Sequence, residues 1–478
     1  MISKMSASGL TCLSLVVGLS GLLLSGCGGG GGSTNTTPPG RTVAPGTTPF
    51  VNTNIASRAA CQPNPHVSGH AKWTVLVYIN AANNLQPASL LNVGQMASVG
   101  SDGTNLNIVI QWKQASVCPY FSSVNDCGTP TFIGTHRYYL LPHDAADVQA
   151  IENGNTSSLE DSAERLPDPS TNVNGTSDMG DWQTLANFIQ WGEAAYPADH
   201  LAVVVWDHGS GALPVLNRST GKVQITRAVS QDCNTGNQIT TQQLAQALSS
   251  SPQKIDLLAI DCSLQCTAEV AYQIRNSARV MVASEESPPG NGYPYDQWLQ
   301  SIKSDGTNPC VVGQNLLNET VAEYPTATDI TQSMVDLSQM GNVAQAVNSF
   351  GSSLLGHVTD QQNLIYTARQ NAQYFEFPEY KDLYDFADDI RTSPGVPTDL
   401  ATAAQNVETS LLGPNGAIMA FVHGSSSQSG SSGLSIYLPG PQEPSSVDNS
   451  VGYDPVYSGL ALAQDAPQWP AFLQAEKE

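Results

Sequence analysis

The chain has 478 residues, of which 12% are charged, and its formal net charge is −23. This acidic balance argues against nucleic acid and against an anionic membrane surface as partners, and it favours basic or neutral ligands. The sequence has neither an HExxH motif nor paired CxxC motifs. We therefore expect no zinc-protease centre and no structural zinc site.

The first 27 residues have the pattern of a secretory signal. Lys4 is followed by an apolar run over 10–24 and by the tetrapeptide LSGC, which ends at Cys27. A basic start, an apolar centre and small residues at the end are typical of a signal peptide rather than a membrane span. The LSGC ending resembles a bacterial lipobox, in which Cys27 would carry lipid and become the mature N-terminus. The alternative is an ordinary signal peptide with an incidental cysteine.

A segment rich in Gly, Thr and Pro follows the predicted lipid anchor. It has too few apolar residues to pack, so we expect a flexible tether over 28–69. The sequence thus predicts a lipoprotein of the bacterial cell envelope, anchored at the outer membrane or cell surface. The remaining body is long enough for one large domain or two smaller ones. We divide it into an α/β domain over 70–305 and a C-terminal part over 306–478, of the same fold or a subdomain.

Continuous apolar runs mark the predicted strands of the body. Such runs, unlike alternating ones, indicate strands buried on both faces, as in a parallel sheet covered by helices. Helix-like stretches lie between them, so the predicted architecture is a layered α/β sandwich. Strands are expected at 74–80, 106–112, 201–207, 256–261 and 279–285, and helices at 184–196, 240–250 and 267–276.

The C-terminal part repeats these patterns. Helical periodicity occurs over 342–355 and 380–390, and two apolar runs over 417–423 and 433–439 indicate further strands. The Gly/Ser stretch over 424–433 that separates these runs is expected to be mobile. The sequence leaves open whether the late strands extend the sheet edge or form a subdomain.

The cysteine count allows disulfides in a secreted protein. Seven cysteines remain beyond Cys12 and Cys27. Cys118 and Cys127 bracket a loop that one disulfide could close. The odd total leaves at least one thiol free or paired between chains.

The strand over 201–207 ends in residues that can carry chemistry. In open α/β sheets, ligands lie beyond the carboxyl ends of the strands. His208 follows this strand directly, and Gly209 behind it permits a sharp turn and could present its N–H to an oxyanion. A lone histidine is more often structural, but this position favours a functional one.

The strand over 256–261 also ends in residues that can carry chemistry. It stops at Asp261 and leads into Cys262, Ser263 and, after two more residues, Cys266. A base and a nucleophile on neighbouring strand ends are typical of a covalent catalyst. The residues alone leave open which of these side chains would be the nucleophile.

The order and spacing of several blocks resemble the clostripain family of cysteine peptidases, which has a caspase-like fold. The resemblance implies an αβα sandwich with a mostly parallel central sheet, and it places the catalytic histidine at His208. It further implies cleavage after Lys or Arg, peptide or protein substrates with basic residues, and calcium as a candidate cofactor. The blocks that carry the resemblance are 73–85, 196–211, 283–295, 380–390 and 433–439.

The segment after Asp261 departs from the family pattern, which reads Asp-Ala-Cys-Leu-Met with a Glu eight residues after the Asp. Asp261 and Glu269 keep that spacing, but the family's alanine falls on Cys262 and its catalytic cysteine on Ser263. The resemblance assigns recognition of a basic P1 side chain to Asp261. Because side chains alternate along an extended chain, Ser263 shares a side with Asp261 and Cys262 points away.

Three nucleophile candidates follow: Ser263, Cys262 and Cys266. Cys262 is expected to be buried as a small apolar residue. If a helix starts near Ser263, Cys266 lies on the same face one turn deeper, where the helix N-terminus would lower its thiol pKa. Serine is a weak substitute for cysteine, because its hydroxyl must lose a proton to His208 during attack.

The sequence therefore supports three functions. The first is an active peptidase that cleaves after Lys or Arg, and the second is an inactive surface protein that binds peptides or proteins through the former cleft. Ala82 and Gln95, which stand where the family often has acidic residues, favour the second and put a bound metal in doubt. The third is an unrelated nucleotide- or sugar-binding lipoprotein, disfavoured because no glycine-rich phosphate loop follows a strand.

The resemblance also implies self-cleavage between the histidine and the nucleophile. The segment that joins them contains three basic residues after which such a cut could occur. They are Arg218, Lys222 and Arg227.

Overall fold

The computed structural model describes residues 50–116, 129–162, 164–166, 177–213, 229–424, 428–441 and 453–476. Several predicted features lie outside these ranges: the lipobox cysteine Cys27, the pair Cys118 and Cys127, and the candidate cleavage residues Arg218, Lys222 and Arg227. Within the described ranges, no helix combines the length and the apolar character needed to cross a membrane.

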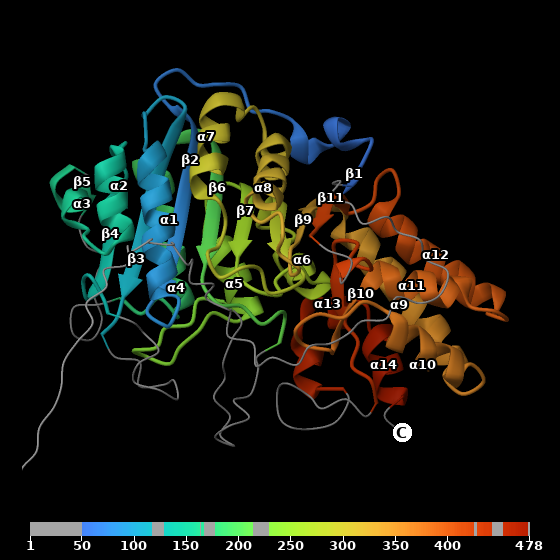
Figure 1. The fold of residues 1–478 in the computed structure, drawn as a ribbon. Helices are drawn as coiled ribbons and strands as arrows, with labels where there is room; N and C mark the ends of the chain where they lie inside the picture. The colour runs from blue at the N-terminus through green and yellow to red at the C-terminus, as the bar shows by residue number, and fades with distance from the viewer. Residues whose placement is uncertain are drawn as a thin grey trace, which may run out of the picture.

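Among the described residues, a ten-stranded sheet forms the centre of the molecule (Figure 1). Its middle is parallel, in the order β8, β7, β6, β2, β3. Each continuous apolar run of the first α/β part forms one of these strands, which confirms the predicted parallel sheet. They are β2 (Ala71–Ala81), β3 (Leu106–Gln114), β6 (Ala198–Trp206), β7 (Ile255–Asp261) and β8 (Ala278–Ser284).

Antiparallel strands extend the sheet on both sides. β4 (Gly134–Tyr139) and β5 (Glu164–Leu166) follow β3. Beyond β8 come β9 (Thr331–Asp336), β11 (Ile418–His423) and β1 (Phe50–Val51). A separate small sheet pairs β10 (Tyr380–Asp382) with β12 (Ser435–Tyr437). The sequence left open whether the late apolar runs extend the sheet edge or form a subdomain. The first run, β11, extends the central sheet, and the second, β12, lies in the separate small sheet.

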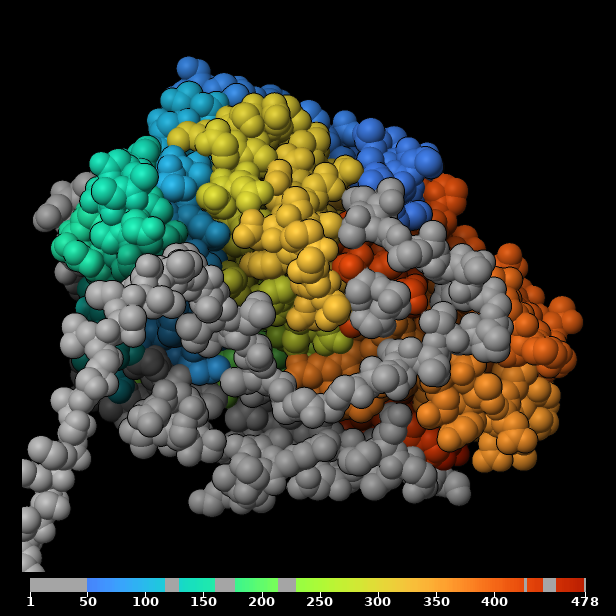
Figure 2. Space-filling model, viewed as in Figure 1, coloured from blue at the N-terminus to red at the C-terminus, as the bar shows by residue number. Residues whose placement is uncertain are grey.

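Alternation along each strand divides the core into two layers. Leu258 and Ile260 of β7 face one apolar cluster, and Leu257 and Ala259 face the other. The second cluster is covered by α1 (Gln86–Val99), α7 (Tyr295–Asp305) and α8 (Pro309–Glu323). Figure 2 shows α7 and α8 in yellow and gold over this face of the sheet.

The first cluster is covered by a larger set of helices. This confirms the αβα sandwich with helices on both faces of the sheet. Next to the sheet lie α4 (Trp182–Ala195), α5 (Thr241–Leu248), α6 (Ala268–Ile274) and α9 (Met340–His357), and against α9 and its neighbours lie α10 (Gln362–Asn371), α11 (Leu383–Thr392), α12 (Thr398–Leu412), α13 (Ala461–Asp465) and α14 (Gln468–Ala475). Two short helices, α2 (Ala145–Glu152) and α3 (Ser157–Ser162), lie near α1 and β5.

The predicted tether does not extend to residue 69. β1 pairs with β11, and the Asn52 N–H donates to the Met419 carbonyl at 2.8 Å. A disulfide then joins Cys61 to Cys310 in the first turn of α8, with Cα atoms 5.1 Å apart. The boundary differs because composition reports only the capacity for local packing, whereas the disulfide alone joins residues 249 positions apart.

Part of the Gly/Ser stretch predicted to be mobile is held in the fold. The Ser432 N–H donates to Asp382 Oδ2 at 2.6 Å, and the Gly433 N–H donates to Glu285 Oε2 at 3.1 Å. Both acceptors are buried. The acidic side chains of two other segments therefore fix residues 428–433 next to the end of β8.

Candidate active site

The candidate site lies where β6 and β7 end, at the edge to which the arrows of the parallel strands point in Figure 1. Trp206 is opposite Asp261 in the parallel register, and the Asp207 N–H donates to the Asp261 carbonyl at 3.3 Å. His208 and Ser263 each come two residues after this matched pair. Equal offsets beyond parallel strands bring these two residues to the same edge.

Gly209 lets the two loops touch. A Cβ atom at position 209 would lie 2.2 Å from the Ser263 carbonyl oxygen and 2.9 Å from the Ser263 nitrogen. The Gln265 side chain also joins the loops, because its Nε2 donates to the carbonyls of Gly211 (3.4 Å) and Ser263 (3.3 Å). The glycine behind the histidine is therefore required by close backbone approach.

His208 is half-buried, and its Nε2 lies 2.7 Å from Asn84 Oδ1 in the turn after β2. The preceding residue, Asp207, is buried and accepts hydrogen bonds from Asn83 Nδ2 (2.6 Å) and from the Gln231 N–H. Burial raises the pKa of Asp207 well above its ordinary value. These contacts fix the backbone on which the imidazole stands.

Ser263 is the half-buried residue of an otherwise buried stretch from Asp261 to Tyr272. Leu264, next to it, has φ +63° and is buried at 1% exposure. A left-handed conformation is uncommon for a leucine and is found where surrounding contacts enforce it. Here the Leu264 N–H donates to the Glu286 carbonyl at 3.3 Å. The turn thus buries Leu264 and leaves Ser263 at the surface of the site.

Cys262 lies in the apolar core. Its Sγ donates to the Val205 carbonyl at 3.5 Å, and burial, then the nearby Asp207 carboxylate, raises the pKa of the thiol well above its ordinary value. The side chain lies in the apolar cluster on the face of the sheet opposite Asp261, as alternation along the strand predicts. A thiol in this environment is protonated and shielded from substrate.

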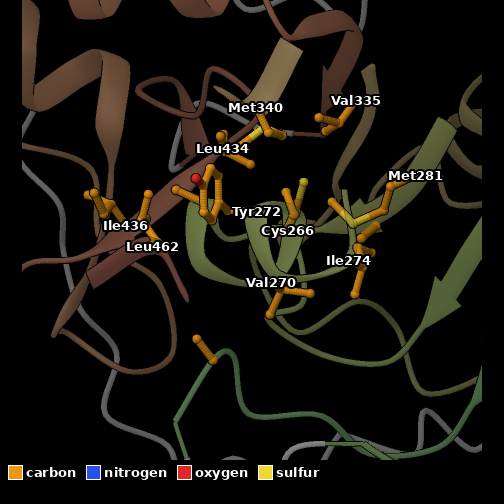
Figure 3. Close-up of a cluster of buried hydrophobic side chains, with 14 of the residues drawn as sticks. Cys266, Val270, Tyr272, Ile274, Met281, Val335, Met340, Leu434, Ile436 and Leu462 are labelled. Carbon is orange, nitrogen blue, oxygen red and sulfur yellow. The ribbon is translucent and has the colours of Figure 1, made fainter. Parts of the chain in front are cut away.

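Cys266 is also a core residue, and Figure 3 shows its sulfur among Val270, Met281 and Val335. Its Sγ donates to the Gly433 carbonyl at 3.2 Å. Burial, followed by the charge of Glu285, raises the pKa of this thiol well above its ordinary value.

The helix predicted at 267–276 is confirmed as α6, so the condition for a lowered thiol pKa at Cys266, a helix that starts near Ser263, is not met. α6 begins at Ala268, and Thr267 is its N-cap, with its side chain accepting from the Val270 N–H at 3.1 Å. Cys266 precedes the helix and does not lie on one of its faces. The threonine cap, rather than the end of the strand, decides where the helix begins.

Asp261 is nearly enclosed, with 6% of its surface exposed. Its Oδ2 accepts hydrogen bonds from the Tyr293 N–H (3.1 Å) and the Tyr295 hydroxyl (2.8 Å). Gly292, at φ +71°, permits this approach, since a Cβ there would lie 2.7 Å from the same oxygen. Burial raises the pKa of Asp261 to about 6, although both hydrogen bonds favour the ionised form.

Two glutamates near the site have different roles. Glu269, which keeps the family spacing, is buried and accepts from the Tyr437 N–H (3.0 Å) and the Tyr457 hydroxyl (2.8 Å), so it ties α6 to β12. Glu286 is half-buried, and burial raises its pKa to about 7. Its Oε1 accepts from the Glu376 N–H at 3.0 Å.

The sequence analysis missed four polar residues of this site: Asn84, Tyr293, Tyr295 and Glu286. All four lie within blocks that carried the family resemblance, Asn84 in 73–85 and the other three in 283–295. Their position in these blocks could have marked them as candidates, but it does not say which side chain each of them contacts.

Calcium, the cofactor that the resemblance implied, finds no cluster of acidic side chains in the described part of the chain. Among the described residues, no three or more His, Cys, Asp or Glu side chains gather in a group that could hold a metal ion. Ala82 is buried, and the Gln95 amide oxygen accepts from Asn92 Nδ2 at 3.1 Å. The two positions where acids are common thus have no carboxylate to offer.

A histidine and a half-buried serine thus stand at adjacent carboxyl ends of the parallel strands in a caspase-like αβα sandwich. The chain belongs to the clostripain family, whose sequence model matches residues 77–475. It is 27% identical over 420 residues to clostripain of Hathewaya histolytica, and this match covers 77% of the chain and 74% of clostripain.

Solved structures show the same fold. An inactive zymogen of a C11 protease from Parabacteroides distasonis matches with a TM-score of 0.57 at 18% identity, over 84% of this chain and 99% of that one. A secreted C11 cysteine protease from Bacteroides thetaiotaomicron, in complex with an irreversible peptide inhibitor, matches with a TM-score of 0.53 at 18% identity, over 83% and 99% of the two chains. The predicted caspase-like architecture is therefore confirmed.

Proposed function

We propose that this chain binds peptide segments containing Lys or Arg through Asp261, and presents them to a nucleophile position occupied by Ser263. The observation that carries the proposal is the contrast in exposure at the end of β7. Ser263 is half-buried, whereas Cys262 and Cys266 lie in the core with raised thiol pKa values. The native chain is accordingly a peptide-binding member of the family with little or no turnover.

The proposed chemistry assigns one role to each group. Ser263 Oγ attacks the scissile carbonyl carbon and its proton passes to His208, while the developing oxyanion faces the Gly209 N–H. His208 then returns the proton to the leaving amine as the C–N bond breaks, which leaves an ester on Ser263. A water molecule that gives its proton to His208 hydrolyses this ester and restores the serine hydroxyl. This sequence is difficult with serine, because the hydroxyl stays protonated until the moment of attack. A thiol at the same place would ionise beforehand, so the present side chain limits the reaction.

The proposed specificity rests on the charge of Asp261. Its carboxylate is held by two tyrosines at a fixed position and retains a small exposed surface. A guanidinium or ammonium group would compensate the cost of keeping this charge in a buried place. The overall charge of −23 adds a long-range attraction for basic segments.

The test is the substitution Ser263→Cys. We expect turnover of a fluorogenic Arg or Lys peptide to appear or rise by about 100-fold or more, since acid–base assistance from a positioned histidine contributes 10²–10⁴-fold. Ser287→Cys is the matched control, because it places a thiol on the neighbouring loop and should add no turnover. The double variant Ser263→Cys, His208→Ala should lose the gain.

Two further measurements separate the alternatives. The native chain should bind an Arg peptide in calorimetry, and Asp261→Asn should weaken that binding. A native turnover that Cys262→Ala or Cys266→Ala abolishes would move the nucleophile to a flanking thiol and overturn the proposal. Native turnover that resists thiol alkylation and is lost in Ser263→Ala would instead make Ser263 an effective nucleophile.

We further propose that the protein is anchored to the bacterial cell envelope by lipid on Cys27. The LSGC tetrapeptide supports this, as does the Gly/Thr/Pro segment before β1, which has too few apolar residues to pack. The mature protein should partition into detergent with the membranes, and Cys27→Ser should leave it soluble or unprocessed. Unchanged partitioning of this variant would rule out the lipid anchor.

A further inference from the structure

We infer that Asn84 is a positioning residue that fixes the tautomer of His208, with the proton on Nε2 and the lone pair on Nδ1. The observation is the contact of 2.7 Å between His208 Nε2 and Asn84 Oδ1. An amide oxygen can only accept, so the imidazole nitrogen facing it carries the hydrogen. In a neutral imidazole the other nitrogen is then the base. The inference rests on the proposed function only in making His208 the base.

The turn that contains Asn84 is held to the strand end that carries His208. The residue before Asn84 and the residue before His208 bond to each other, since Asn83 Nδ2 donates to Asp207 Oδ1 at 2.6 Å. The same Nδ2 lies 3.2 Å from the carbonyls of Asn80 and Gln231. Asn83 Oδ1 accepts from the Leu85 N–H at 2.9 Å. The amide and the imidazole are thus attached to one rigid frame, as positioning requires.

The place of Asn84 in the chain makes its orientation informative. An asparagine just before a helix would ordinarily cap it by accepting from a first-turn N–H. The N-cap of α1 is Leu85, which makes no side-chain cap, and Pro87 in the first turn removes one of the donors that a cap would satisfy. The Asn84 oxygen is directed to His208 instead.

A neutral acceptor at this position has a chemical consequence. It orients the imidazole without adding a negative charge that would stabilise the imidazolium form. A thiol that ionises before attack needs orientation of the base above all, whereas a serine mechanism gains from a carboxylate that stabilises the imidazolium. The amide at position 84 therefore suits a cysteine at position 263 better than the serine now present.

The experiment measures the tautomer directly, by long-range ¹H–¹⁵N NMR of the full chain labelled at histidine, with His208→Ala to assign the signals. We expect the Nε2–H pattern for His208 in the native protein and a tautomer-averaged pattern in Asn84→Ala. Asn84→Asp, which keeps an acceptor oxygen, should retain the Nε2–H pattern. An Nδ1–H pattern in the native protein, or no change in Asn84→Ala, would overturn the inference.

Asn64→Ala is the matched control. Asn64 lies beside His200 near the start of β6, with its side-chain Nδ2 3.5 Å from His200 Nδ1. Its substitution should change the His200 signals and leave those of His208 as they are. If Asn84→Ala does not fold, the native pattern and Asn84→Asp still decide the question.

A kinetic arm separates this inference from the proposed function. In the Ser263→Cys background, Asn84→Ala should lower kcat by about 10- to 100-fold with little change in KM, because orientation of the base acts on the chemical step. Asn84→Asp should recover most of that loss. If Ser263→Cys has no activity, the proposed function fails, and the NMR experiment still tests whether Asn84 fixes the tautomer of His208. If it is active and insensitive to Asn84, the inference fails alone.

Discussion

The ends of β6 and β7 differ in what surrounds their functional side chains. At the end of β6, His208 stands on a buried polar frame formed by Asn83 and Asp207. At the end of β7, the residues on both sides of Ser263 belong to the core, and the turn is shaped by Leu264 in a left-handed conformation. The comparison shows that side-chain hydrogen bonds fix the end of β6, whereas apolar burial and backbone contacts fix the end of β7.

The same comparison explains why a serine is tolerated at position 263. The β7 turn is held by backbone contacts, from the Leu264 N–H to the Glu286 carbonyl and from the Cys266 N–H to the Ser284 carbonyl. Neither contact uses the side chain at position 263. We therefore expect a cysteine at position 263 to change reactivity and to leave the fold unchanged.

The largest expected effect is self-cleavage, which a thiol at position 263 would allow at the end of β7. Purified Ser263→Cys should be cut after Arg218, Lys222 or Arg227, while the native chain stays intact, as judged by gel and intact mass. The double variant Ser263→Cys, His208→Ala should also stay intact. Equal cutting of the double variant would assign the cut to another protease.

The next effect concerns the contact between the two strand ends. In the Ser263→Cys background, Gly209→Ala should lower kcat/KM by about 100-fold, because a Cβ would meet the Ser263 carbonyl and displace an oxyanion donor. Gly290→Ala is the control, since a Cβ at that glycine meets nothing within 4 Å. Equal activity of the two variants would show that the loops approach each other less closely than the structure indicates.

A smaller effect is the pH dependence of binding, which tests whether the Asp261 carboxylate binds the basic side chain. Its pKa is raised to about 6, so the carboxyl is neutral below that value and its attraction for a basic side chain is lost as the pH falls. Affinity of the native chain for an Arg peptide should rise by about tenfold from roughly pH 5 to pH 7, following the ionised fraction.

Two variants identify the titrating group. Asp261→Asn should remove the pH dependence, and Glu286→Gln should keep it, although the Glu286 pKa is raised to about 7. A dependence that disappears in Glu286→Gln instead would assign the titration to that residue. Because the Asp261 pKa in the folded state lies above its ordinary 3.8, ionising this group also costs stability. The free energy of unfolding should therefore fall as the pH rises from about 4 to about 6, and less so in Asp261→Asn.

The smallest effect concerns the two core thiols. Treatment of the native chain with iodoacetamide should leave Cys262 and Cys266 unmodified and change Arg-peptide affinity by less than about twofold, because both thiols are buried and protonated. Cys262→Ala should lower the free energy of unfolding by about 1 kcal/mol through lost packing. Rapid alkylation of either thiol in the folded protein, measured by mass spectrometry, would contradict their place in the core.

The sequence by itself determined the parallel centre of the sheet. Strands such as β6 and β7 are apolar on both faces, and this local pattern has few other solutions in a chain of this size. It also predicted that His208 and Ser263 each follow a strand of that sheet, and the register then shows the two strands to be neighbours. The family spacing then identified Asp261 as a candidate for substrate recognition.

Only the tertiary structure decided the contacts between distant segments. The left-handed turn at Leu264 is enforced by its burial and its contact with Glu286, and the extent of the N-terminal arm depends on the disulfide to Cys310. The contact of Asn84 with His208 likewise joins residues 124 positions apart. Periodicity reports which face of an element is buried, but the partner of a polar side chain is chosen by how the elements pack.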